Sequence, residues 1–123
     1  MKIKRGEIWM VNLPSTGNSI QSGFRPCIIV SNEQANMFSS VIHIVPLTSK
    51  ESKAKLPTHV IVEHENLKVK STAMCEQNML IDKNNLVRKV CDLDARTMNK
   101  IDVSLLIQFG IYNKVVKAMA IHA

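Results

Sequence analysis

Residues 18–30 read NSIQSGFRPCIIV, a glycine-containing loop followed by a Phe-Arg-Pro corner and an apolar run. Pro26 restricts its own φ and favours an extended backbone at Arg25, so the approach to the apolar run is partly preset. The run from Cys27 to Val30 is typical of a strand buried on both faces. Arg25 is therefore predicted to stand where a loop meets a rigid strand. It is either an anion-binding group at the mouth of a barrel or an ordinary surface arginine.

Short apolar segments on both sides of this stretch predict a mainly β protein. Their apolar residues alternate or run continuously, and polar or proline-containing turns separate them. Pro46 inside one segment indicates a bulge or an edge position. The polar segment 32–40 is turn-like, with at most one helical turn. The predicted strands are Glu7–Leu13, Pro26–Ser31, Val41–Thr48, Thr58–Glu65, Ser71–Asp82 and a short one near Val87–Val90.

The hydrophobic period changes after Asp94, which is a favourable N-cap residue. Apolar residues then recur on one face, which predicts a helix over residues 95–110. Residues 111–123 are apolar enough to pack, but their pattern distinguishes neither helix nor strand. Five or six strands and one late helix predict a small twisted barrel capped by a helix. The predicted core face of the helix consists of Met98, Ile101, Leu105 and Phe109.

The composition is that of a single globular domain spanning residues 1–123. It is 46% hydrophobic and 21% charged, which excludes the disordered class. Sixteen basic and ten acidic side chains give a net charge of +6, which favours an anionic partner such as nucleic acid. The sequence shows neither a signal-peptide pattern nor an apolar run long enough to span a bilayer. A soluble cytoplasmic protein with no membrane partner is therefore expected.

Cysteine and histidine spacing gives no support to metal or disulfide chemistry. Cys27, Cys75 and Cys91 are odd in number and lie in apolar runs, as reduced core thiols do. His59 and His64, on one predicted strand, would point to opposite faces. The sequence contains no HExxH, no CxxC pair, no phosphate-binding glycine loop and no GxSxG. No cofactor and no metal are expected.

Polar residues at several predicted strand ends are candidates for one anion-binding rim. Arg25 precedes the second strand, and Thr48 and Ser49 end the third. Glu76 and Gln77 interrupt the fifth, where neighbours point to opposite faces and the inward one needs a partner. Strand ends of a barrel can meet at one rim even when they are far apart in sequence. An arginine fork suits phosphate, while hydroxyls and amides add directional hydrogen bonds.

Basic and aromatic side chains near these positions offer further contacts to nucleic acid. Lysines spaced along two connections can follow a phosphodiester backbone, although for each one separately a solvated loop is the favoured interpretation. Phe24, beside Arg25, either stacks on a base or anchors its loop on the core. The lysines concerned are Lys50, Lys53, Lys55, Lys68 and Lys70.

The order and spacing of several short motifs resemble those of the MazF/PemK family of toxin endoribonucleases. The resemblance extends over roughly residues 4–110, and the KLPTHV segment after a strand ending in Thr-Ser is quite specific to it. The segments that carry it are RGEIW (5–9), the Gly23, Arg25, Pro26 corner, IIVSN (28–32), PLTS (46–49), KLPTHV (55–60), CEQ (75–77) and Ile81-Asp82.

This resemblance implies an SH3-like small barrel of the CcdB/PemK-like kind with a C-terminal helix, assembled as a homodimer. It implies a toxin of a type II toxin–antitoxin system that cleaves single-stranded RNA, including mRNA, at a short sequence without a metal. In the family, the 2′-hydroxyl attacks the adjacent phosphorus and leaves a 2′,3′-cyclic phosphate and a 5′-hydroxyl. A cognate antitoxin with an acidic tail is expected to occupy the RNA site.

Arg25 and Thr48 match the two family positions tied most directly to cleavage, which makes them the catalytic candidates. Arg25 is expected to stabilise charge on the phosphorane, with acid catalysis as a second role left open. Thr48 is expected to position the phosphate or the 2′-hydroxyl. The RNA-binding candidates are Ser19, Gln21, Phe24, Ser49, Lys53, Lys55, Glu76 and Gln77.

Two positions depart from the family pattern. Ile20 stands where many members carry a glutamate, and an isoleucine cannot accept a proton. Met79 stands where an arginine is frequent, and the lost charge is expected to weaken the phosphate contact or to shift the preferred sequence. Two alternatives to the enzyme stay open: a non-enzymatic inhibitor on the same fold, like the CcdB-type toxins that bind a topoisomerase, and a degenerate member that binds RNA or antitoxin without cutting.

Overall fold

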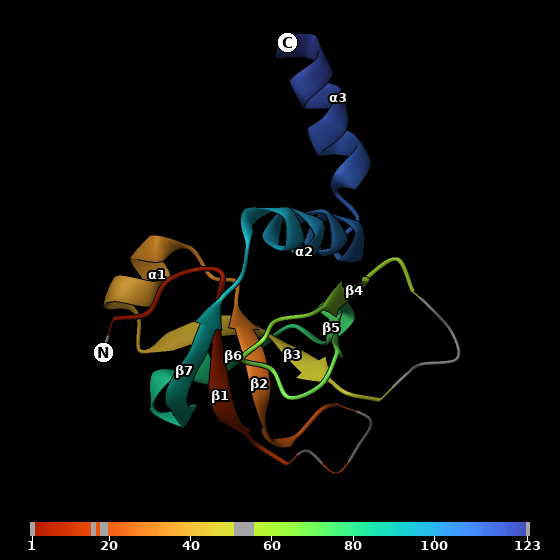
Figure 1. The fold of residues 1–123 in the computed structure, drawn as a ribbon. Coiled ribbons are helices and arrows are strands. Elements are labelled where there is room, and N and C mark those ends of the chain that lie inside the picture. Colours follow the sequence, from red (N-terminus) through yellow and green to blue (C-terminus); the bar gives the residue numbers. More distant parts are fainter. Residues whose placement is uncertain (1, 16, 18–19, 51–55, 123) are drawn as a thin grey trace.

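The computed structural model describes residues 2–15, 17, 20–50 and 56–122. Within them the chain forms a curled antiparallel sheet with helices at its margins (Figure 1). In chain order the elements are β1 (Glu7–Leu13), β2 (Gly23–Ile29), α1 (Glu33–Phe38), β3 (Val41–Thr48), β4 (His59–Val62), β5 (Ser71–Met74), the 3₁₀ turn η1 (Cys75–Gln77), β6 (Met79–Asp82), the 3₁₀ turn η2 (Lys83–Asn85), β7 (Leu86–Asp92), α2 (Ala95–Gln108) and α3 (Tyr112–His122).

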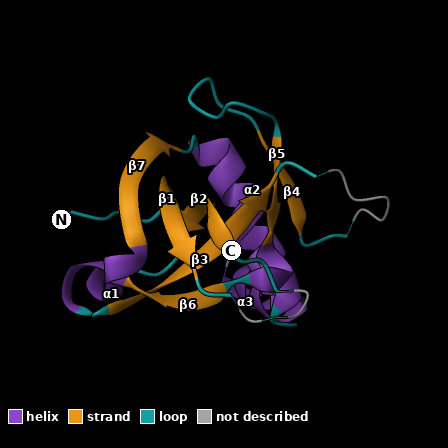
Figure 2. Cartoon of the chain, turned by 90° about the horizontal axis from the view of Figure 1, so that it is seen from below, coloured by secondary structure: helices purple, strands orange, loops and turns teal. Residues whose placement is uncertain are grey.

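The strands follow the order β4-β5-β3-β2-β1-β7, and β6 adds to β3 beside this path. All of these pairs are antiparallel. The sheet curls without closing, with β4 and β7 at the two ends of the pairing path (Figure 2). The predicted class, a mainly β barrel-like fold with a C-terminal helix, is confirmed.

The strand β3 changes partner along its length. Val41–Ile44 pair with β6, whereas Leu47 and Thr48 pair with β5. Pro46 falls between these two sets, so its missing N–H is tolerated on that edge. The expected bulge is wrong, because the register of β3 against β2 is regular from Ile44 to Pro46, but Pro46 does occupy a local edge position on the opposite side, between the pairings with β6 and β5.

Most of β1 and β3 and the Cys27–Ile29 part of β2 are buried on both faces, and for β2 this confirms the prediction from the apolar run. Successive residues of a strand point to opposite faces, and each face has its own apolar cluster. One cluster includes Trp9, Val11, Cys27, Ile29 and Ile44. The other includes Ile8, Ile28, Val45, Leu47 and, from α2, Ile101.

The predicted strand Ser71–Asp82 is wrong, because the structure divides it into β5, η1 and β6. Asn78 closes the intervening turn: its backbone N–H and its side-chain amide both donate to the carbonyl of Cys75, at 3.3 and 2.9 Å. The predicted strand Thr58–Glu65 is also too long. β4 ends at Val62, and His64 takes part in the next turn, where its Nδ1 accepts from the N–H of Asn66 at 3.0 Å.

The predicted helix is confirmed as α2, capped by the side chain of Asp94 and ending at Gln108. Gly110, with φ of +72°, ends it in the left-handed conformation that favours glycine. Phe109 is therefore the C-cap and is 61% exposed, so its predicted place on the core face is wrong. The segment without an assignment contains α3, which projects away from the strands (Figure 1). No helix in the described part of the chain is long and apolar enough to cross a bilayer.

A buried carboxylate fastens β1 to β7. Glu7 accepts hydrogen bonds from the backbone N–H of Lys4 at 2.8 Å and from Trp9 Nε1 at 3.1 Å. It also pairs with Lys89 Nζ at 2.7 Å. Burial raises the pKa of Glu7, but the hydrogen bonds from Lys89, Lys4 and Trp9 outweigh it and hold the pKa below its ordinary value of 4.5.

Replacement of Glu7 is predicted to make stability less dependent on acid pH. A carboxyl group with a lowered folded-state pKa stabilises the protein fully above its unfolded-state pKa, and this contribution disappears as pH falls through the folded-state value. Glu7→Gln should therefore be less stable than wild type at neutral pH, and the difference should shrink below pH 4.5. Urea unfolding across this range measures it, and a difference that stays constant into strong acid would contradict the assignment.

Candidate functional site

A pocket of about 520 Å³ opens at the ends of β2 and β3. One side is built by the last residues of β3 and the first residues of β2, and the other by the loop before β5 and by β7. Its lining includes Phe24, Arg25, Thr48, Ser49, Lys50, Asn66, Lys68 and Arg88.

Strand register brings Arg25 and Thr48 together. Cys27 pairs with Pro46 across β2 and β3, and the same register continued by two residues sets Arg25 opposite Thr48. Opposed residues of antiparallel strands lie on the same face of a sheet. The two catalytic candidates, distant in sequence, thus lie side by side at one edge of the pocket.

The guanidinium of Arg25 is half-buried and is held by backbone carbonyls. Its Nε donates to the carbonyl of Ser22 at 3.0 Å, and its Nη1 donates to that of Leu47 at 3.3 Å. These contacts use only part of the planar fork of donors, so the remaining N–H groups are available to an anion in the pocket. Because both anchors are main-chain groups, the direction of the fork is set by the fold.

The hydroxyl of Thr48 is oriented by its own strand end. Its Oγ1 accepts a hydrogen bond from the backbone N–H of Lys50 at 3.2 Å. The hydroxyl hydrogen therefore remains free to donate, and a phosphate oxygen beside Arg25 is a suitable acceptor. Together Arg25 and Thr48 present a charged fork and a neutral hydroxyl to the same space.

The walls of the pocket are basic on several sides. Lys50 follows β3, Lys68 belongs to the loop before β5, and Arg88 stands opposite Met10 in the pairing of β7 with β1. Phe24, 55% exposed, adds an aromatic face beside Arg25. A positive pocket with an exposed ring suits a phosphodiester and an unpaired base.

Four of the predicted site residues line this pocket: Arg25, Thr48, Phe24 and Ser49. Glu76 and Gln77 lie apart from its lining, in η1, and Gln77 contacts Gln21 instead. The predicted positions Ser19, Lys53 and Lys55 lie outside the described residues.

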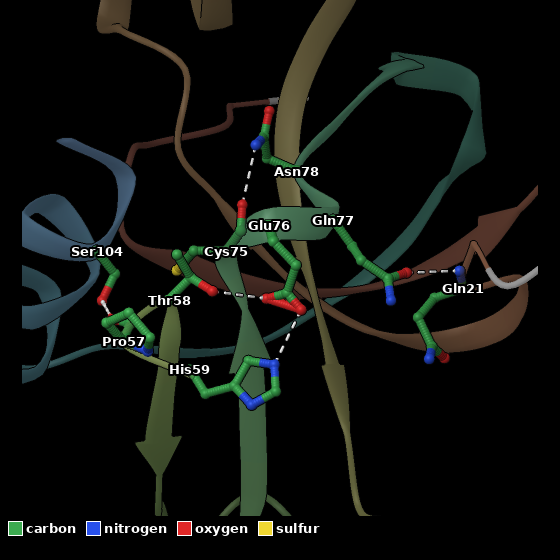
Figure 3. A network of polar contacts seen from close by, with 9 residues as sticks. All are labelled: Gln21, Pro57, Thr58, His59, Cys75, Glu76, Gln77, Asn78 and Ser104. Atoms are coloured by element: carbon green, nitrogen blue, oxygen red, sulfur yellow. Dashed lines mark hydrogen bonds and ion pairs between the residues drawn. The ribbon is translucent and has the colours of Figure 1, made fainter. Parts of the chain in front are cut away.

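Glu76 and Gln77 were predicted to point to opposite faces of a strand. This prediction is wrong, because both residues lie in the turn η1. Both residues are partly buried, and each has a protein partner. The carboxylate of Glu76 contacts Thr58 Oγ1 at 3.1 Å and His59 Nε2 at 2.9 Å (Figure 3). Sequence reasoning missed Arg88 as a pocket residue and His59 as the partner of Glu76. Their signals were an arginine in a short predicted strand and a histidine in the KLPTHV segment.

The thiol nearest the pocket is buried. Cys27 is 0% exposed and its Sγ contacts the carbonyl of Arg25 at 3.7 Å. Burial raises the pKa of Cys27 to about 12 despite the nearby charge of Arg25, and burial likewise raises that of Cys75 to about 12. Among the described residues, no three His, Cys, Asp or Glu side chains are grouped as a metal site would require.

Comparison with known proteins gives a consistent result. A family model described as PemK-like, MazF-like toxin of type II toxin-antitoxin system matches residues 4–109. An endoribonuclease in complex with its cognate antitoxin from a mycobacterial species is 24% identical with a TM-score of 0.73, covering 89% of this chain and 96% of that one. MazF from Deinococcus radiodurans is 18% identical with a TM-score of 0.78, covering 89% and 98%. At these identities the structural likeness shows the shared fold.

The raised pKa values predict thiols that do not react in the native state. A thiol with a pKa of about 12 carries almost no thiolate at neutral pH, and the thiolate is the nucleophile. Iodoacetamide should therefore leave Cys27 and Cys75 unmodified in the folded protein and should alkylate both in urea. Mass spectrometry of the peptides distinguishes the sites, and rapid native labelling of Cys27 would contradict its burial beside Arg25.

Proposed function

The chain belongs to the PemK-like, MazF-like toxins of type II toxin–antitoxin systems, and from this premise we propose that it cleaves single-stranded RNA at a short sequence. It acts in the cytoplasm as one domain over residues 1–123. The supporting observation is the meeting of Arg25 and Thr48 at a basic pocket. Structurally similar proteins include endoribonucleases from mycobacterial species, which agrees with the proposal.

The proposed step is an internal transesterification. The 2′-hydroxyl attacks the adjacent phosphorus, the bond to the 5′-oxygen breaks, and the products carry a 2′,3′-cyclic phosphate and a 5′-hydroxyl. The nucleophile belongs to the RNA itself, so the protein has to align the groups and to stabilise the phosphorane, and we propose that no metal takes part. The remaining N–H groups of Arg25 face the charged oxygens, and Thr48 donates its hydroxyl hydrogen to the same phosphate or orients the 2′-hydroxyl.

Residues around this pair are proposed to grip the RNA on either side of the cut. Phe24 stacks on a base and Ser49 adds a directional hydrogen bond. Lys50, Lys68 and Arg88 neutralise neighbouring phosphates, so binding should weaken as salt concentration rises. A cognate antitoxin with an acidic segment would neutralise the toxin by covering the same positive pocket.

The working unit is proposed to be a two-fold homodimer. Exposed apolar side chains accumulate toward the C-terminal end of the chain, including Phe109, Ile111, Val116 and Met119. Such a surface is typical of an interface, and a closed two-fold contact buries it in both copies. Light scattering at micromolar concentration should give about twice the 13.8 kDa of one chain, and the mass of a single chain would exclude this assembly.

Cleavage of a long single-stranded RNA in EDTA tests the proposed reaction. The wild type should make discrete cuts with cyclic-phosphate ends. Arg25→Ala should lower the rate by about a hundredfold or more, as expected for loss of a donor that stabilises developing charge. Thr48→Val should lower it by about tenfold or more because the hydroxyl is lost, and Thr48→Ser should restore most of the rate.

Two comparisons make this experiment specific. Arg96→Ala, on the exposed first turn of α2, removes the same charge away from the pocket and should cut like the wild type. Arg25→Lys keeps the charge but loses the planar fork, so it should fall between wild type and Arg25→Ala. A folded wild type that cuts no sequence-rich RNA would favour a binding toxin, and cutting that survives Arg25→Ala would refute the assigned active site.

A further inference from the structure

We infer that Glu76 is a positioning residue that holds the loop before Arg25 through η1, and that it does not contact RNA. The consequence for catalysis rests on the proposed function, whereas the contacts themselves belong to the free protein. Figure 3 shows the arrangement: Glu76 points toward Thr58 and His59, while its neighbour Gln77 points the other way, toward Gln21.

Among the residues that the structure describes, a long-range hydrogen bond links η1 to the loop. The side-chain oxygen of Gln77 accepts from the backbone N–H of Gln21 at 2.8 Å, across 56 residues of sequence. Gln21 is followed by Ser22, whose carbonyl accepts from Arg25 Nε at 3.0 Å. A displacement of the Gln21 backbone would therefore move one of the two carbonyls that aim the guanidinium.

In the described part of the chain, three polar contacts link η1 to the start of β4 and to the residue before it. Thr58 Oγ1 donates to one carboxylate oxygen of Glu76 at 3.1 Å, and His59 Nε2 lies 2.9 Å from the other. The backbone N–H of Cys75 donates to the carbonyl of Thr58 at 3.0 Å. Thr58 is 6% exposed, so this attachment lies within the packed body of the protein.

The segment 57–59, which contacts η1, is itself hydrogen-bonded to α2. The hydroxyl of Ser104, which is buried, donates to the carbonyl of Pro57 at 3.2 Å. A turn held by a helix and a strand can transmit position to a loop, because packed elements resist small displacements. We therefore expect η1 to hold the backbone of Gln21 in a fixed position relative to β4 and α2.

The charges also argue against an RNA contact at Glu76. Both of its carboxylate oxygens are engaged with protein groups, and a carboxylate repels a phosphodiester. The side chains of His59 and Glu76 are 14% and 25% exposed and contact each other. Removal of the carboxylate would loosen η1 without removing any group that lines the pocket.

Hydrogen exchange and kinetics together test the inference. In the free protein, Glu76→Ala should speed exchange of the Gln21 amide by about two- to tenfold, the range expected when a hydrogen bond is weakened. On an oligonucleotide carrying the mapped cut sequence, kcat should fall by about tenfold while KM changes by less than about twofold. An RNA contact at Glu76 would instead raise KM and leave the Gln21 amide unchanged.

Conservative variants separate positioning from general destabilisation. Thr58→Val is nearly isosteric and removes one hydrogen-bond donor to Glu76. It should also speed hydrogen exchange of the Gln21 amide, and it replaces Glu76→Ala in the test if that variant does not fold. Gln77→Glu keeps an acceptor for the Gln21 N–H and should retain its protection, whereas Gln77→Leu should lose it. Glu63 lies outside this network, and its side chain is 69% exposed. Glu63→Ala should therefore match the wild type in both measurements.

Unchanged Gln21 exchange in both Glu76→Ala and Thr58→Val would overturn the inference. Faster exchange with an unaltered kcat would also overturn it, because the loop would then have no bearing on catalysis. If the wild type itself cuts no RNA, the proposed function fails, and that result is separate because the exchange measurement uses the protein without RNA.

Discussion

The interior strand β3 determines where the functional groups of this protein meet. Its first half pairs with β6 and its second half with β5, while β2 lies along its other edge. The pairing with β2 sets Thr48 beside Arg25, and η1 follows β5 at the point where the partner of β3 changes from β5 to β6. A shift of one residue in this register would turn each of these side chains to the opposite face.

The sequence predicted the parts of this arrangement that depend on local pattern. Arg25 was identified because proline and a buried strand follow it, and Thr48 because it ends an apolar strand. The turn at Cys75–Gln77 escaped prediction, because Asn78 closes it with side-chain and backbone bonds inside an otherwise strand-like run. Arg88 escaped because its place in the pocket depends on the pairing of β7 with β1, which connects opposite ends of the chain.

The guanidinium of Arg25 is held in a fixed orientation while its positive charge stays available to an anion in the pocket. Main-chain carbonyls hold its guanidinium, and the buried, uncharged thiol of Cys27 contacts the backbone carbonyl of Arg25. Acidic groups in contact with the pocket would compensate the arginine and weaken its attraction for an anion. Glu76 is instead engaged by Thr58 and His59, so its charge is satisfied away from the pocket.

The pairing of β1 with β7 has a consequence for the way the chain is made. During synthesis the N-terminal strand leaves the ribosome long before its partner exists, and Arg88, which lines the pocket, belongs to that late partner. The contact between Gln21 and Gln77 is likewise absent until the later residue emerges. A nascent chain therefore carries Arg25 and Thr48 before Arg88 and Gln77 exist, and the pocket acquires its full set of basic walls only after β7 has been made.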